Sequence, residues 1–140
     1  MSVRSLVHGQ AQGEVLRLGE PLSFWGGFDS STGCVIDRFH PQHHACLTGK
    51  ILFVERGRGS SSGASVLAEA LRLGTAPAAI ILVDDDAIIA TGALVAQMLY
   101  EIDCPVVALG DREAWQRLST LPRLSLEAGA EGVKFTQPAG

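Results

Sequence analysis

Residues 51–83 read ILFVERGRGSSSGASVLAEALRLGTAPAAIILV and decide the fold, because three structural signals follow one another in this stretch. Residues 51–54 form an apolar run with the length of a buried strand. From Gly63 onward, apolar residues recur at helical spacing until Gly74, a residue type that commonly ends helices. Residues 78–83 are continuously apolar, as expected for a strand that is covered on both faces. The stretch therefore predicts a strand, a loop, a helix and a second strand.

The rest of the chain extends this pattern on both sides. Apolar runs separated by turn residues predict strands in the first half, and alternating signals predict a βαβα arrangement in the second half. The expected strands are residues 3–7, 14–18, 34–36, 105–109, 124–126 and 133–135, and the expected helices are residues 88–100 and 113–118, the last capped by Asp111. We expect one layered α/β domain over residues 1–140, with right-handed crossovers and loose ends at about residues 1–2 and 137–140.

The size and charge of the chain exclude several classes of protein. Its 140 residues, of which 46% are hydrophobic, can bury one core. The net charge of −4 argues against nucleic acid as a partner, because phosphate binding needs a basic face. The longest apolar run, residues 76–83, is too short to cross a membrane, and the N-terminus lacks the pattern of a signal peptide. We therefore expect a cytoplasmic protein that contacts neither nucleic acid nor membrane.

The three cysteines, Cys34, Cys46 and Cys104, are widely separated and form no Cys-x-x-Cys pair. This odd and scattered set predicts neither a disulfide framework nor a zinc knuckle, and reduced thiols fit a cytoplasmic protein. An iron–sulfur cluster usually needs more cysteine ligands than this chain offers. We therefore expect this chain to hold no metal or cluster on its own.

The loop at residues 57–63, GRGSSSG, carries the most chemical information. Its glycines allow a sharp turn and a close approach to a ligand, and the helix that follows attracts anions to its N-terminus. Arg58 offers a planar cation for a carboxylate, and the three serines offer hydroxyls. The spacing matches neither the P-loop nor the dinucleotide fingerprint. Two interpretations remain: a carboxylate or phosphate site, or a turn whose serines cap the helix.

Histidines form a second cluster, with His40, His43 and His44 following Asp37. Imidazoles are good metal ligands, but adjacent histidines point apart on an extended chain and no fourth ligand follows at a standard spacing. A structural or interface role is favoured for His40, which precedes Pro41.

Two further motifs allow more than one interpretation. Phe24 and Trp25 stand beside Gly26 and Gly27, so they either meet a partner or fill the core next to a tight turn. The acidic run at residues 84–86 lacks the spacing of a calcium loop, and the favoured interpretation is a turn in which Asp86 caps a helix.

These motifs occur together and in a single order, and together they resemble the swivel-domain family of aconitase X over about residues 13–107. The residues that carry the resemblance are 23–27, Asp37, His40 with Pro41, 49–52, 57–63, 74–80, 92–93 and 99–100. Two segments depart from the family pattern: the His43 and His44 pair, and the charged Glu55 and Arg56 that precede the serine loop.

The resemblance implies a single swivelling β/β/α domain, as in the mobile domain of aconitases. It also implies a heterodimer, or a multiple of one, with an aconitase X large subunit that holds the substrate and an iron–sulfur cluster. Bacterial relatives dehydrate cis-3-hydroxy-L-proline to Δ1-pyrroline-2-carboxylate, and archaeal relatives dehydrate mevalonate 5-phosphate. The small subunit of such a hydro-lyase is inactive without its large subunit. The serine triplet and the run at residues 77–81 favour the hydroxyproline branch.

The family's Gly-Arg/Lys-Gly-Ser pattern implies roles for single residues of the loop. It places the proton acceptor on Ser60, with Ser62 as the next candidate. The substrate-binding residues implied are Arg58, Gly59, Ser61, Ser62 and Gly63. A noncatalytic domain that binds a carboxylate or phosphate is the alternative from another class. A self-sufficient hydrolase finds no support, because no nucleophile elbow is present.

Overall fold

The computed structural model describes residues 3–59 and 61–138, which form a seven-stranded sheet, a two-stranded hairpin and four helices. The large sheet contains β1 (Arg4–Val7), β2 (Gly9–Arg17), β5 (Ile51–Phe53), β6 (Ala79–Leu82), β7 (Val106–Ala108), β8 (Arg123–Gly129) and β9 (Gly132–Thr136). The helices are α1 (Phe24–Gly27), α2 (Gly63–Leu73), α3 (Ala87–Tyr100) and α4 (Arg112–Leu118). The hairpin pairs β3 (Phe28–Asp29) with β4 (Cys34–Val35). Residues 1–2 and 139–140, part of the predicted loose ends, lie outside the described residues.

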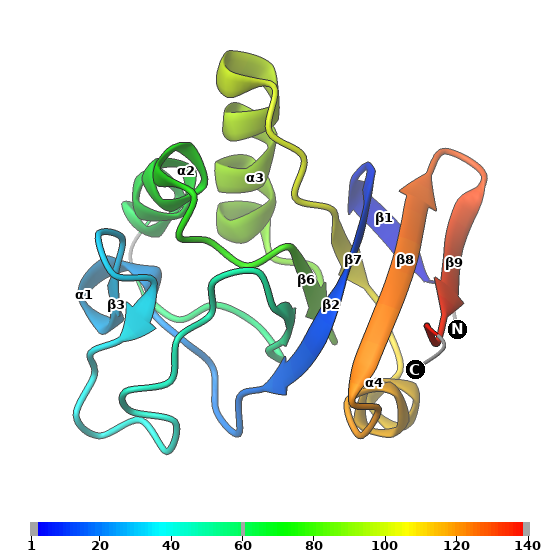
Figure 1. Cartoon of the computed structure of the whole chain (residues 1–140), viewed down its shortest axis with the longest axis horizontal. Coiled ribbons are helices and arrows are strands. Elements are labelled where there is room, and N and C mark those ends of the chain that lie inside the picture. Colours follow the sequence, from blue (N-terminus) through cyan, green and yellow to red (C-terminus); the bar gives the residue numbers. More distant parts are fainter. Residues whose placement is uncertain (1–2, 60, 139–140) are drawn as a thin grey trace.

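The large sheet is mixed and strongly curved. Its strand order is β1-β7-β6-β5-β2-β8-β9, in which β2, β5, β6 and β7 run parallel while β1, β8 and β9 are antiparallel to their neighbours. The two edge strands, β1 and β9, contact each other, so the sheet curls toward closure (Figure 1).

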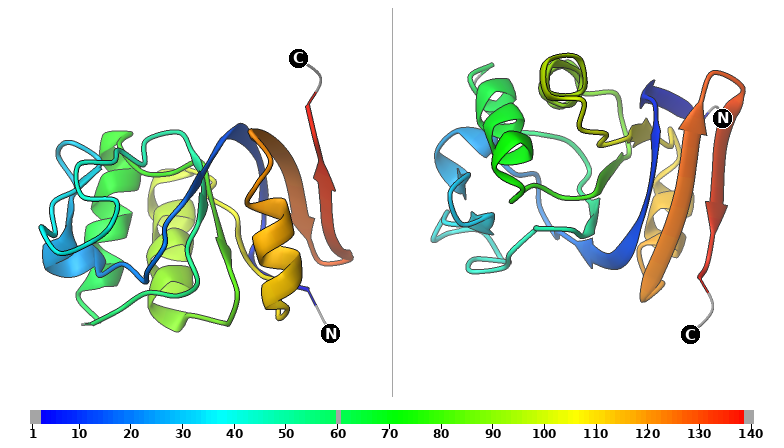
Figure 2. Two further views of the ribbon diagram at one scale, coloured as in Figure 1. Left: turned by 90° about the horizontal axis from the view of Figure 1, so that it is seen from below. Right: turned by 45° about the horizontal axis from the view of Figure 1, so that its top comes forward.

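Strand β6 shows how the sheet separates two apolar layers. All four of its residues are buried, and they alternate between the faces as the period of a strand requires. Ile80 and Leu82 belong to the core under α2 and α3, whereas Ala79 and Ile81 belong to the core shared with α4 and β8. Figures 1 and 2 show α2 and α3 on one side of the sheet and α4 on the other.

Trp115 fixes α4 against the sheet. Its side chain is 1% exposed, and its indole N–H donates to the backbone carbonyl of Ile81 at 3.0 Å. The ring meets Phe53 edge to face with centroids 5.9 Å apart, and the guanidinium of Arg17 lies 5.1 Å from the ring centroid on the outer side. One aromatic side chain therefore joins a helix, a central strand and a solvent-facing cation.

Helices α2 and α3 cross closely at Gly92. A Cβ atom at this position would lie 2.7 Å from the carbonyl oxygen of Ala64 and 3.1 Å from Cβ of Leu67. Glycine is a weak helix former, and this close approach explains why the helix contains it. The crossing fixes the start of α2, which follows directly after the serine loop.

Most elements agree with the sequence predictions, and the differences have physical causes. β2 begins at Gly9 and not at residue 14, because its polar first half pairs with β8 and not with the parallel strands. The strand predicted at residues 34–36 is β4, whereas its partner β3 and the α1 turn were not predicted, since each is too short to show a period. Asp111 caps α4 and Gly74 ends α2 in the left-handed conformation, as expected.

The prediction of three reduced cysteines is wrong. Cys34 and Cys46 form a disulfide, because the chain turns back after β4 and Val35 exchanges backbone hydrogen bonds with His44 and Ala45, which brings the two cysteines into an antiparallel bridge. Cys104 is free and fully buried, and burial raises the pKa of its thiol to about 12. Only one thiol remains, and it is unreactive.

Among the helices of residues 3–59 and 61–138, none combines the length and the apolar character that a membrane crossing requires.

Replacing Trp115 by Phe should lower the free energy of unfolding by about 1–3 kcal/mol, because the buried carbonyl of Ile81 loses its donor. Urea denaturation of the purified chain measures this change. The matched control is Trp25→Phe, at the other tryptophan, which is 59% exposed and should change stability by less than about 0.5 kcal/mol. Equal effects of the two substitutions would contradict the anchoring role of Trp115.

The disulfide makes a prediction that thiol titration checks. The purified, unreduced chain should titrate a single thiol, that of Cys104, when it is unfolded in denaturant, and all three cysteines should titrate after reduction. Reduction should also lower the free energy of unfolding by about 2–3 kcal/mol, since it frees a short loop in the unfolded chain. Three titratable thiols before reduction would show that the pair is not bonded.

Candidate active-site loop

The serine loop lies at the carboxyl end of β5, between this strand and α2. Strands β5 and β6 are parallel, so the loop after β5 and the turn after β6 meet at one edge of the sheet. This edge is where open α/β sheets usually bind ligands. A small groove of about 50 Å³ opens there. It is lined by Leu22, Phe24, Gly57, Arg58, Gly59, Gly63, Asp86, Ile88 and Ile89.

Asp86 holds the first residue of the loop. Its Oδ2 accepts the backbone N–H of Gly57 at 2.7 Å, while its Oδ1 accepts the N–H groups of Ile88 and Ile89 at 3.0 Å each. The sequence predicted the helix cap at Asp86 but not the bond to Gly57, because these residues are far apart in the chain. The sequence signals this bond only through the second oxygen of the Asp86 carboxylate, and every aspartate has one.

A second attachment comes from the segment before α1. Leu22 pairs with Gly57 in a parallel bridge, and the N–H of Arg58 donates to the carbonyl of Leu22 at 3.0 Å. Gly59 follows with φ of +96°, and a Cβ there would lie 3.0 Å from Oγ of Ser23. Both the left-handed backbone and the close approach favour glycine at this position. The loop stem is therefore held from two directions.

Arg58 has an acidic neighbour that sequence reasoning missed. Its Nη2 lies 3.5 Å from Oε1 of Glu20, and both side chains are about half exposed. An exposed pair of this kind contributes little to stability, so Arg58 can exchange Glu20 for another carboxylate at low cost. The guanidinium remains accessible beside the groove.

The serines themselves are only partly described. Ser60, the predicted proton acceptor, lies outside the described residues. Ser61 and Ser62 are exposed and precede α2, with Ser62 at the N-cap position. The backbone of Ser62 is helical, at φ −61° and ψ −16°, and the N–H groups of Ala64 and Ser65 bond to the carbonyls of Ser61 and Ser62. The first N–H groups of α2 are therefore bonded to main-chain carbonyls. These bonds do not support the interpretation that the serine side chains cap the helix.

The two aromatic residues before the loop have different environments. Phe24 is buried and packs edge to face on Phe28 with centroids 5.2 Å apart, so it belongs to the core. Trp25 is exposed, and its backbone nitrogen would lie 3.8 Å from a Cβ at Gly63. The core interpretation therefore holds for Phe24, and Trp25 is left at the surface, where it could meet a partner.

His40 is a structural residue. It is 4% exposed, its Nδ1 accepts the N–H of Gln42 at 3.0 Å, and its Nε2 lies 3.1 Å from the carbonyl of Glu20. Because Nδ1 is an acceptor, Nε2 carries the proton and donates to that carbonyl. The ring therefore fixes the segment that bears the acidic partner of Arg58. His43 and His44 stack on each other with centroids 3.7 Å apart.

The described side chains do not form a site for a metal or an iron–sulfur cluster. Within residues 3–59 and 61–138, no three histidine, cysteine or acidic side chains come together in the way a metal requires. Two cysteines are joined to each other, and the third is buried with a raised pKa. In the acidic run, Asp85 pairs with Arg4 and Asp86 caps α3, so these two carboxylates bind groups of the protein itself.

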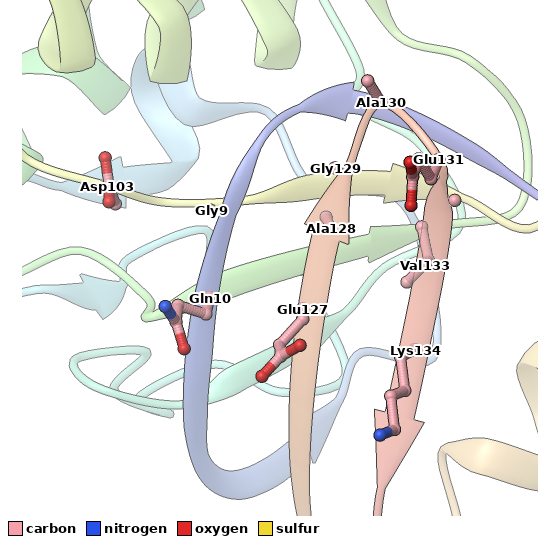
Figure 3. Close-up of a pocket in the computed structure, with 11 residues that line it drawn as sticks. Gly9, Gln10, Asp103, Glu127, Ala128, Gly129, Ala130, Glu131, Val133 and Lys134 are labelled. Atoms are coloured by element: carbon pink, nitrogen blue, oxygen red, sulfur yellow. The ribbon is translucent and has the colours of Figure 1, made fainter.

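A larger hollow of about 710 Å³ lies away from the serine loop, beside the β8–β9 hairpin. It adjoins Asp103, which precedes β7 and so lies near the opposite edge of the parallel strands. Figure 3 shows carboxylates of Asp103, Glu127 and Glu131 around it, with Lys134 as its one cation. The hollow lies away from the serine loop, so its size does not identify the site.

Known proteins are similar to this chain in sequence. A family model described as the aconitase X swivel domain matches residues 1–135. The cis-3-hydroxy-L-proline dehydratase of Pseudomonas aeruginosa is 43% identical over 97% of this chain, and this chain spans only 24% of that protein. The phosphomevalonate dehydratase small subunit of Methanothermobacter thermautotrophicus is 46% identical over 66% of this chain and 71% of that subunit.

Two solved structures share the fold over nearly the whole chain. One is the crystal structure of Thermococcus kodakaraensis aconitase X in its holo-form, with a TM-score of 0.75, 32% identity and coverage of 96% of each chain. The other is the solution NMR structure of a UPF0107 protein, with a TM-score of 0.81, 32% identity, and coverage of 99% of this chain and 98% of that chain. The family-model match over residues 1–135 and the fold shared over nearly the whole chain show that this chain belongs to the aconitase X swivel-domain family.

Proposed function

We propose that this chain is the small, swivel-domain subunit of a hydro-lyase that dehydrates cis-3-hydroxy-L-proline to Δ1-pyrroline-2-carboxylate. The observation that carries the proposal is the 43% identity to a cis-3-hydroxy-L-proline dehydratase over 97% of the chain. The active site is shared, since this chain contributes the serine loop and a large subunit contributes the remainder.

The alternative substrate is mevalonate 5-phosphate, because small subunits of phosphomevalonate dehydratases reach 46% identity. Their match extends over 66% of the chain, compared with 97% for the hydroxyproline enzyme. The charges around the loop also favour the amino acid. Arg58 pairs with the carboxylate of Glu20, and this mixture of charges suits a zwitterion better than a phosphate group.

Ser60 is the proposed base. In the reaction its Oγ takes the proton from Cα of the substrate, the C–H electron pair forms the double bond to C3, and the C3 hydroxyl leaves. The resulting enamine tautomerises to Δ1-pyrroline-2-carboxylate. A serine hydroxyl must lose its own proton first, and two features favour its anion: the cation of Arg58, two residues away, and the N-terminus of α2.

The groove of this chain is incomplete as an active site. A volume of about 50 Å³ holds only a few water molecules and cannot enclose a proline ring. The departing hydroxide also needs a Lewis acid, and the described side chains offer no metal-binding set. We assign this function to an iron–sulfur cluster of the large subunit, and we assign the exclusion of water to closure of the two subunits.

Trp25 and Phe39 are proposed to lie at the surface that meets the large subunit. Trp25 is 59% exposed next to the end of the serine loop, and Phe39 is 89% exposed in the segment held by His40. Large exposed aromatics are enriched in interfaces, where they bury much area with few rotatable bonds.

Substituting Ser60 by Ala in the reconstituted complex should lower kcat for cis-3-hydroxy-L-proline by about 10²–10⁴-fold, because the base is lost. KM and assembly of the two subunits should change little. Product formation at saturating substrate measures the effect. Turnover at the wild-type rate would exclude Ser60 as the base.

Two matched variants and a second substrate complete this experiment. Ser62→Ala tests the other candidate base, and Ser65→Ala controls for the loss of an exposed hydroxyl within α2. Dehydration of mevalonate 5-phosphate in place of hydroxyproline would support the alternative substrate. A wild-type complex that binds either compound without converting it would support the noncatalytic domain.

Arg58→Lys should raise KM about tenfold with a smaller effect on kcat, because an ammonium group replaces a planar fork that can bind a carboxylate through two hydrogen bonds. Steady-state kinetics of the complex measure this split. Glu20→Gln is the matched control, since it removes only the exposed partner of Arg58 and should change KM less than about threefold. Unchanged kinetics in Arg58→Lys would refute the carboxylate contact.

A further inference from the structure

We infer that Asp86 is a positioning residue for the serine loop, and this inference rests on the proposed function of that loop. Asp86 does not belong to the loop and follows β6, at the start of α3. Its carboxylate serves two backbone segments at once, through Oδ1 to α3 and through Oδ2 to Gly57. The bond to Gly57 is the shortest of the three, at 2.7 Å.

The two oxygens of Asp86 have separable roles. Oδ1 satisfies the N–H groups of Ile88 and Ile89, which is the ordinary work of an N-cap. Oδ2 accepts the N–H of Gly57, at the point where the chain leaves the sheet and enters the loop. A bond from an N–H to a charged oxygen is stronger than a neutral one, so it defines the position of the stem.

Only glycine fits at position 57 beside the Asp86 carboxylate. A Cβ at Gly57 would lie 2.9 Å from Oδ2 of Asp86 and 3.3 Å from Cδ1 of Ile89. The stem can therefore approach the carboxylate only because residue 57 has no side chain. The glycine serves a close contact here, since its φ is not in the left-handed range.

Both ends of the loop lie against the first turn of α3. Gly57, at the start, is bonded to Asp86, and a Cβ on Gly63, at the end, would lie 3.6 Å from Cγ2 of Ile88. Residues 58–62 connect these two points along the chain. A shift of the stem at Gly57 would therefore displace the proposed base, three residues further along the chain.

Asp86→Asn separates the two roles. Asparagine is as good an N-cap as aspartate, so its amide oxygen can still accept from Ile88 and Ile89. Its NH2 group, however, faces the N–H of Gly57, and two donors cannot bond to each other. We expect kcat of the reconstituted complex to fall about tenfold or more, with KM within about twofold of wild type and the thermal midpoint lowered by only a few degrees, because a single hydrogen bond is lost.

The control is Asp111→Asn. Asp111 caps α4 in nearly the same conformation, at φ −148° and ψ 110° against −138° and 106° for Asp86, and it accepts the N–H of Glu113 at 3.0 Å. This variant makes the same chemical change at a cap outside the groove, and it should leave kcat and KM unchanged. A purely structural role of Asp86 predicts equal effects of the two substitutions.

A second measurement does not depend on activity. In the isolated chain, the amide hydrogen of Gly57 should exchange at least about tenfold faster in Asp86→Asn than in wild type, and Asp111→Asn should leave it unchanged. Unchanged exchange at Gly57, or an unchanged kcat in an active complex, would overturn the role of Asp86. If the wild-type complex lacks dehydratase activity but the exchange result holds, the proposed reaction fails while the attachment of the loop stands.

Discussion

Burial of β6 on both faces is the constraint on which the rest of the structure depends. A strand without a solvent-facing side must be covered twice, so α2 and α3 lie on one face and α4 with β8 on the other. Covering both faces forces the chain to cross over between parallel strands. The turns that follow the strands then gather at one edge, and the serine loop meets the cap of α3 there.

Periodic features could be predicted from the sequence, and non-local contacts could not. The helix that ends at Gly74 and the buried run of β6 follow from patterns of apolar residues that are local in the chain. The first half of β2 did not show such a pattern, because its partner β8 lies at the other end of the sequence. The Cys34–Cys46 bond depends on an antiparallel bridge that the loop after β4 forms, and no local pattern indicates that bridge.

The candidate site divides in the same way. Arg58 and the glycines that surround it could be recognised as a loop suited to an anion, and the resemblance to a family placed the expected base on Ser60. The residues that hold the loop in place, Leu22 and Asp86, and the counter-ion Glu20 come from other segments. No local rule connects them to the loop, since only the folded sheet edge brings them together.

The contrast between the two tryptophans has an optical consequence. Trp115 is enclosed in the core, whereas Trp25 stands in solvent beside the loop, and the chain has no other indole. With Trp115 replaced by Phe, all indole emission would come from the loop face. The colour and intensity of that light would then report directly, in real time, when another protein covers this face.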